Sequence, residues 1–157
     1  MHGGLLIRVG LISDTHDLLR PEAAAFLRGA DHIVHCGDIV SPEILDELRT
    51  IAPVTAVRGN NDRGAWAGRL RETESLELGG VRIYVIHDLK LLDIDPHAGD
   101  VRVVASGHSH KPAVEERDGV LFVNPGSAGP RRFSLPITVA RLVLSADDVD
   151  ATIVPLT

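Results

Sequence analysis

The chain has 157 residues, of which 44% are hydrophobic, and its formal net charge is -6. This length and apolar content suit one compact domain over residues 1–157, and the apolar runs are far shorter than the roughly 20 residues that cross a bilayer, so we expect no membrane partner. The acidic balance argues against a stable complex with nucleic acid, because proteins that coat nucleic acid displace counterions with a cationic surface.

At the N-terminus, residues 1–4 contain neither a basic stretch nor a small-residue cleavage site, so we expect no secretory signal. The apolar run 5–12 lacks a helical period and predicts a core strand. Residues 21–28 begin with proline and precede Gly29, which predicts a helix. A second strand is expected over 32–36. It ends in Cys36, the only cysteine, which we expect to be a buried thiol in a cytoplasmic protein.

A second helix is predicted after Ser41, because serine is a preferred N-cap residue and is followed here by a proline and a glutamate. Its apolar residues Ile44, Leu45 and Leu48 share one face. A third strand is expected over 54–58. The alternation of strand, loop and helix predicts parallel strands with right-handed crossovers.

From residue 75 onward the pattern changes to short strands separated by turn signals. Two expected hairpins turn at 79–80 and 118–119, and further strands are predicted over 101–106, 137–144 and 150–154. We therefore expect the second half to be mostly antiparallel. Two sheets packed face to face with helices outside would bury both patterns. The predicted fold is α/β, a four-layer αββα sandwich of two mixed β-sheets flanked by helices.

Metal-ligating side chains follow several of the predicted strands. They occur in the segments 14–16 (Asp-Thr-His), 37–38 (Gly-Asp), 59–62 (Gly-Asn-Asn-Asp) and 107–110 (Gly-His-Ser-His), with His87 between the last two. Because ligands gather where loops leave the carboxyl ends of parallel strands, we expect these side chains to meet at one edge. Gly107 has no side chain and allows a close approach of the backbone.

Several carboxylates and imidazoles at one edge need a cation to offset their burial. A set of carboxylate, imidazole and amide ligands without thiolate suits manganese, iron, zinc, nickel or cobalt and does not distinguish among them. Seven such ligands are too many for one ion with an open coordination position. They suit two divalent ions that share a bridging carboxylate.

This ordered set of motifs, from Asp14 to the turn 124–127, resembles the calcineurin-like metallophosphoesterase superfamily, most closely its small YfcE-like phosphodiesterase branch. The resemblance implies two metal ions, with manganese expected to support activity in vitro, and in-line attack on phosphorus by a hydroxide that bridges them. It implies catalytic roles for Asp38, Asn60 and His108. The implied ligands are Asp14, His16 and His110 for the first ion, Asn60, His87 and His108 for the second, and Asp38 for both.

The sequence departs from the family pattern at two positions. Many members carry histidine where this chain has Asn61, which cannot donate a proton as an acid. We therefore hypothesise modest turnover and a preference for esters with acidic leaving groups. His87 is usually followed by glycine, but here by Asp88, for which two interpretations stay open: it orients His87, or it faces solvent.

Polar residues near the motifs have simpler interpretations. We expect Asp62 to buttress the Asn60 loop, His35 to be a satisfied core or supporting histidine, and the turn 124–127 to underlie the metal loops, where Asn124 is also a candidate to hydrogen-bond a ligand. Arg131 and Arg132 are candidates to contact a substrate phosphate, although a solvated loop is the default interpretation.

The predicted activity is hydrolysis of a small or nucleotide-like phosphodiester. Two alternatives remain: a protein-interaction scaffold of the Vps29-like kind, which resembles this fold but carries a degraded metal set, and a nuclease. The sequence leaves the substrate, the native metal and assembly into a homo-oligomer undetermined.

Overall fold

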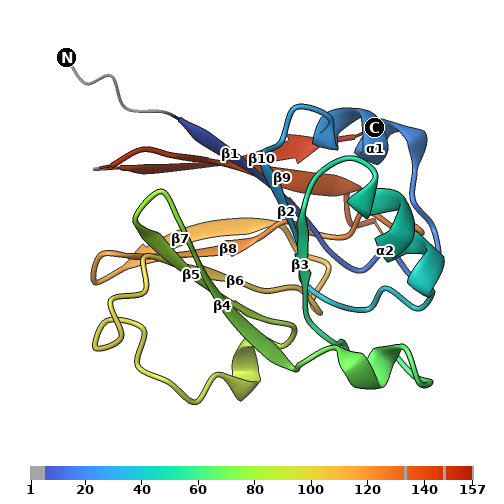
Figure 1. The fold of residues 1–157 in the computed structure, drawn as a ribbon, viewed down its shortest axis with the longest axis horizontal. Coiled ribbons are helices and arrows are strands. Elements are labelled where there is room, and N and C mark those ends of the chain that lie inside the picture. Colours follow the sequence, from blue (N-terminus) through green and yellow to red (C-terminus); the bar gives the residue numbers. More distant parts are fainter. Residues whose placement is uncertain (1–5, 133, 147, 157) are drawn as a thin grey trace.

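The computed structural model describes residues 6–132, 134–146 and 148–156. Figure 1 shows two β-sheets that lie against each other, with two helices on the outer side of one of them. The expected core strand at the N-terminus begins only at Ile7; Leu6 is exposed, and residue 5 lies outside the described residues. The elements in chain order are β1 (Ile7–Ile12), α1 (Pro21–Leu27), β2 (His32–His35), α2 (Pro42–Arg49), β3 (Val54–Ala56), β4 (Thr73–Leu78), β5 (Val81–Ile86), β6 (Val103–Ala105), β7 (Ala113–Arg117), β8 (Val120–Asn124), β9 (Thr138–Leu144) and β10 (Val149–Pro155).

Each sheet has five strands. The first has the order β10-β9-β1-β2-β3, and the second has the order β4-β5-β6-β8-β7. The main core lies between the sheets, where Leu11 and Val34 of the first sheet join Ile83 and Val103 of the second in one buried apolar cluster. The predicted face-to-face packing of two mixed sheets is confirmed.

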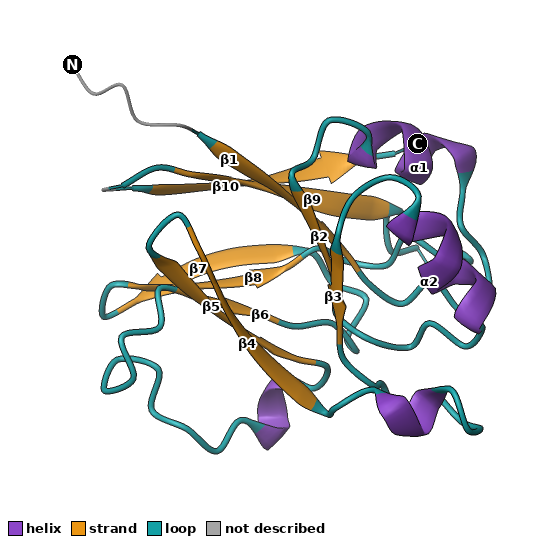
Figure 2. Ribbon diagram, in the orientation of Figure 1, coloured by secondary structure: helices purple, strands orange, loops and turns teal. Residues whose placement is uncertain are grey.

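The two outer faces are covered differently. Helices α1 and α2 lie on the outer face of the first sheet (Figure 2), where Leu27 and Leu48 pack in a second apolar cluster. The outer face of the second sheet is covered by the segment 87–102, which contains a short 3-10 helix, η2 (Leu89–Leu91). Leu89 and Leu92 of this segment pack against buried Val104. Among the described residues, no helix is long and apolar enough to span a bilayer.

The pairing of the second half combines hairpins with a parallel centre. The expected hairpins β4/β5 and β7/β8 are antiparallel, as is β9/β10. In contrast, β5, β6 and β8 run parallel to one another. In the first sheet β1, β2 and β3 are parallel, as predicted. Each sheet therefore has three parallel strands whose carboxyl ends deliver loops to one edge, and this arrangement positions the site described next.

Candidate metal centre

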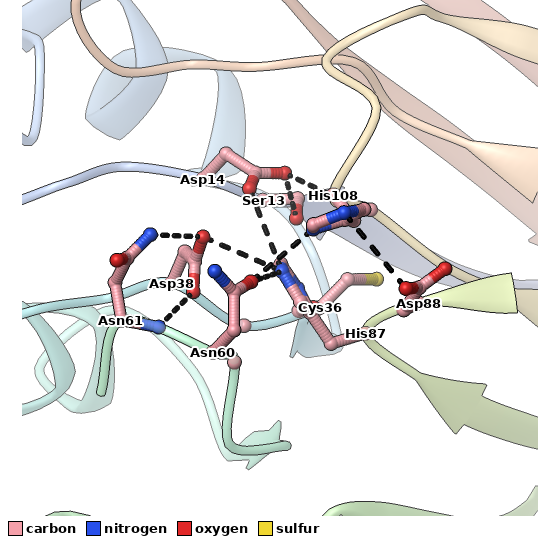
Figure 3. A network of polar contacts seen from close by, with 12 residues as sticks. Ser13, Asp14, Cys36, Asp38, Asn60, Asn61, His87, Asp88 and His108 are labelled. Atoms are coloured by element: carbon pink, nitrogen blue, oxygen red, sulfur yellow. Dashed lines mark hydrogen bonds and ion pairs between the residues drawn. The ribbon is translucent and has the colours of Figure 1, made fainter. Parts of the chain in front are cut away.

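The predicted ligands meet where the carboxyl ends of the two sets of parallel strands come together. Asp38 follows β2 in the first sheet, and its Oδ2 lies 3.6 Å from Nε2 of His16, which follows β1. The same Oδ2 lies 3.4 Å from Nε2 of His87, which follows β5 in the second sheet. Nε2 of His110, after β6, lies 3.5 Å from Oδ1 of Asp14. The site therefore spans the seam between the sheets (Figure 3).

Backbone conformation helps to aim these side chains. Five of the residues have positive φ values that L-residues rarely adopt: Asp14 (54°), His16 (44°), Asp38 (58°), His108 (71°) and His110 (63°). Such conformations cost of order 1–3 kcal/mol each and persist only where the surrounding structure imposes them. The loops are thus held in a strained form that fixes the directions of the candidate ligands.

The two carboxylate oxygens of Asp14 have different surroundings. Oδ2 accepts hydrogen bonds from the Ser13 hydroxyl (2.7 Å) and from the His108 backbone N–H (3.1 Å). Gly107 permits this approach, since a Cβ there would lie 2.7 Å from Oδ2. Oδ1 is buried, has no hydrogen-bond partner among the described residues, and faces the imidazoles of His16, His87 and His110. Burial raises the pKa of Asp14 despite the hydrogen bond from Ser13.

Asn61 grips the Asp38 carboxylate with two donors. Its backbone N–H donates to Oδ1 (2.8 Å), and its side-chain amide donates to Oδ2 (2.9 Å). Burial alone would raise the pKa of Asp38, but the hydrogen bonds from His87 and Asn61 outweigh it and hold this pKa well below its usual range. The carboxylate therefore stays ionised at the centre of the site.

His87 is oriented by the other sheet. Its Nδ1 lies 2.6 Å from the Cys36 carbonyl oxygen, which only accepts, so Nδ1 carries the proton. Nε2 then points to Asp38 and to Oδ1 of Asn60, 3.0 Å away. Burial lowers the pKa of His87. The contact with Asp38 and the charge of Asp14 raise this pKa by a larger amount, so the net shift is upward. This Nε2 therefore lies among acceptors that favour a cation, either a proton or a metal ion.

Asn60 and His108 complete this side of the site. Oδ1 of Asn60 lies 3.2 Å from Nδ1 of His108, whose Nε2 lies 3.8 Å from Oδ2 of Asp88. Asp88 also accepts the backbone N–H of Lys90 and caps η2. Neither sequence interpretation of Asp88 holds fully: its carboxylate contacts His108 and Lys90 rather than His87, and the residue is only partly exposed.

The donor set fits divalent cations. The buried atoms Asp14 Oδ1, His16 Nε2 and His110 Nδ1 have no hydrogen-bond partner among the described residues. Two groups bring their possible ligand atoms within 4.8 Å of one another: Asp14 with His16 and His110, and Asp14 with Asp38 and His87. Buried carboxylates and imidazoles without partners are stabilised by metal coordination.

Asp62 holds two of the loops together. One oxygen accepts the backbone N–H groups of Ile39 (2.8 Å) and Val40 (2.7 Å), and the other accepts those of Asp38 (3.0 Å) and Gly59 (2.8 Å). The carboxylate is buried, and both of its oxygens accept hydrogen bonds from backbone N–H groups. Its predicted role as a buttress is confirmed.

A neutral histidine supports the same loops from below. His35 is fully buried, and desolvation lowers its pKa to about 3. Its Nδ1 accepts the Gly37 N–H (3.1 Å), so Nε2 carries the proton and donates to the Thr15 hydroxyl (3.0 Å). The prediction for His35 is confirmed. Sequence reasoning missed Thr15 and Ser13, although both flank Asp14 in the motif that drew attention to it.

The turn 124–127 ties the remaining loops. The Asn124 amide donates to the Gly107 carbonyl (3.0 Å) and to the Ser109 hydroxyl (3.1 Å), and its Oδ1 accepts the Gly126 N–H. The Ser127 hydroxyl donates to the backbone carbonyl of Asp14. The turn therefore underlies the loops as expected, and the Asn124 amide donates its hydrogen bonds to them.

A cavity of about 520 Å³ is lined by His108, Ser109 and Asn124 among other residues. Two smaller cavities flank the candidate ligands. One, of about 270 Å³, is lined by Asn60, His87 and His108 together with Arg58. The other, of about 240 Å³, is lined by His16 and His110 together with Pro130, Arg131 and Arg132. Arg131 and Arg132 thus border the site and are exposed, in agreement with the default interpretation of a solvated loop.

Residues 7–147 match the model of the calcineurin-like phosphoesterase superfamily domain, and the chain belongs to this superfamily. It is 38% identical to a probable metallophosphoesterase of Methanothermobacter thermautotrophicus, over 93% of this chain and 91% of that protein. The family and this relative support a hydrolase of phosphoric ester bonds that uses divalent metal ions.

Two solved structures share the fold. A chain described as a novel archaeal phosphodiesterase has a TM-score of 0.79 and 25% identity, covering 94% of this chain and 100% of that chain. Wild-type Vps29 of Entamoeba histolytica in complex with zinc has a TM-score of 0.71 and 25% identity, covering 96% and 100%. The fold thus occurs both in a phosphodiesterase and in Vps29.

Proposed function

We propose that the protein is a phosphodiesterase that hydrolyses small or nucleotide-like phosphodiesters at a centre of two divalent ions. The observation that carries this proposal is the position of Asp38, whose Oδ2 lies between Nε2 of His16 and Nε2 of His87. A carboxylate that faces candidate ligands from both sheets suits a bridged pair of ions.

The proposed assignment of ligands is the one that the family resemblance implies. The first ion would be held by Asp14, His16 and His110, and the second by Asn60, His87 and His108, with Asp38 shared. Two such ions would supply an ionised water at neutral pH and stabilise charge on the attacking and leaving oxygens. Manganese, iron, zinc, nickel and cobalt all suit these ligands.

The preference for diesters follows from the family, and the two flanking cavities support it. A phosphorus atom at the centre would direct one ester arm toward the cavity beside His108 and the other toward the cavity beside His110. Arg132 borders the second cavity, where a guanidinium suits phosphate oxygens. A monoester would use only one of the two cavities. We also propose a cytoplasmic location, which is expected from the single cysteine.

Asn61 sets the expected leaving-group dependence. Its side-chain amide donates to Asp38, and it has no proton to give as an acid. We expect the Asn61→His variant to hydrolyse alkyl esters about tenfold faster than wild type, with a smaller gain on aryl esters whose leaving groups need no protonation. Steady-state rates over a series of esters with graded leaving-group pKa would measure this. A wild-type rate that does not depend on leaving-group pKa contradicts the hypothesis.

The proposed activity is tested with a chromogenic diester, bis(p-nitrophenyl) phosphate, and the matching monoester. We expect the protein to be inactive after chelation and to recover on addition of manganese or another divalent ion, with higher kcat/KM for the diester. The number of ions bound per chain, measured by elemental analysis after gel filtration, should approach two.

Two outcomes would favour the alternatives. Binding of metal without hydrolysis of any ester in a broad panel would favour a scaffold, the alternative that the Vps29 structure suggests. Cleavage of single-stranded nucleic acid at a higher kcat/KM than small diesters would favour a nuclease.

A further inference from the structure

An open groove of about 430 Å³ lies on the outer face of the first sheet, beside the end of α1. Its lining includes Arg8, Arg28 and Arg141 together with Phe26 and Gly10. We call it the arginine groove. It opens along the first half of β1, whereas the candidate metal centre lies beyond the other end of that strand.

Strand register brings two of the arginines together. In the antiparallel β1/β9 pair, Arg8 is opposite Val143, and Gly10 is opposite Arg141. Side chains alternate between the faces of a strand, and Val9 lies in the core between the sheets, so Arg8 shares the outer face with Arg141 as a diagonal neighbour. Arg28, the residue that caps the end of α1, supplies the third guanidinium.

These three guanidinium groups have no carboxylate partner within ion-pair distance among the described residues. Elsewhere in the chain Arg58, Arg82 and Arg117 pair with glutamates. The Arg141 guanidinium lies over the Phe26 ring, whose centroid is 5.3 Å away. The nearby Asp31 carboxylate accepts the backbone N–H of Arg8 (2.8 Å) rather than a guanidinium. In a chain of net charge -6, three guanidinium groups without an ion pair thus share one groove. An anion bound among them would be attracted by all three groups.

We propose that the arginine groove binds a small, multiply charged phosphate compound of the pyrophosphate or polyphosphate class. Guanidinium groups present paired donors that match phosphate oxygens, and the volume falls in the range of small-molecule sites. Since Arg141 already covers the Phe26 ring, charge rather than aromatic stacking carries recognition. This site is separate from the proposed catalytic centre and does not depend on it.

The test uses inorganic pyrophosphate and metal-free protein, in which the carboxylates of the catalytic edge repel anions. We expect calorimetry at physiological salt to detect binding to wild type. The affinity should fall about tenfold in Arg8→Gln and in Arg141→Gln, and binding should be lost in the double variant. Two-dimensional NMR of wild type should show pyrophosphate-induced shifts at the amides of Gly10, Gly29 and Ala30.

Arg102→Gln is the matched control, because it removes the same charge from an exposed arginine outside the groove and should bind as wild type does. Diester hydrolysis by the metal-loaded groove variants should be unchanged. The proposal is overturned if wild type does not bind pyrophosphate, if the double variant still binds, or if NMR shifts appear only at Gly37, Gly59 and Gly107. Tighter binding of a single-stranded oligonucleotide than of pyrophosphate would overturn the assignment to small phosphates.

Discussion

Asp38→Asn is expected to lower kcat for diester hydrolysis by about 1,000-fold or more. Asparagine keeps the size of the side chain but removes the negative charge that faces both His16 and His87. It also places an amide nitrogen or a neutral oxygen where the Asn61 amide now donates to a carboxylate. The loss should therefore combine weaker metal binding with a poorly oriented centre.

Two measurements accompany the Asp38 rate. Elemental analysis should show the bound metal falling from about two ions per chain to one or fewer, because the shared ligand is lost. Asp46→Asn removes an equivalent charge from the exposed face of α2 and should leave both values unchanged. An Asp38→Asn protein that keeps two ions and more than about a tenth of wild-type kcat would refute the bridging role.

Asp62→Ala is expected to reduce the free energy of unfolding of the metal-free protein by about 3–5 kcal/mol. The change leaves four backbone N–H groups, from the loops after β2 and β3, without their acceptor. Val40, a β-branched residue at φ 75°, loses one of the bonds that hold it in that conformation. Urea unfolding followed by circular dichroism measures the effect.

The Asp62 result has a graded control. Asp62→Asn keeps one accepting oxygen and should lose less stability than the alanine variant. Asp46→Ala, on the exposed face of α2, should lie within about 0.5 kcal/mol of wild type. If Asp62→Ala unfolds at the same urea concentration as Asp46→Ala, the loops do not depend on this carboxylate.

Periodicity and turn residues predicted most strands within a few residues. The hairpin at Gly79 and Gly80 was predicted because an antiparallel turn has a local residue signature. The parallel pairing of β5, β6 and β8 was not predicted, because crossover connections such as 87–102 are long and carry no such signature. Leu6 was misplaced because hydrophobicity alone does not show where a strand leaves the core.

The candidate ligands were named from sequence because each of them follows a predicted strand in an ordered motif. The residues that contact the candidate ligands were harder to predict. Asp88 caps η2 and faces His108, a contact that depends on how the segment 87–102 folds back. The sequence showed that Asn61 replaces a family histidine and cannot act as an acid. Its two hydrogen bonds to Asp38 depend on loop geometry that the spacing of residues does not reveal.

The seam position of the ligands has a consequence for the life of the protein in the cell. On the proposed assignment, ions held between His16 on one sheet and His87 on the other would cross-link the two sheets and stabilise the folded state. A cell starved of transition metal would then contain a chain that opens more often and is cleared sooner by proteases, so metal supply would govern its abundance as well as its chemistry.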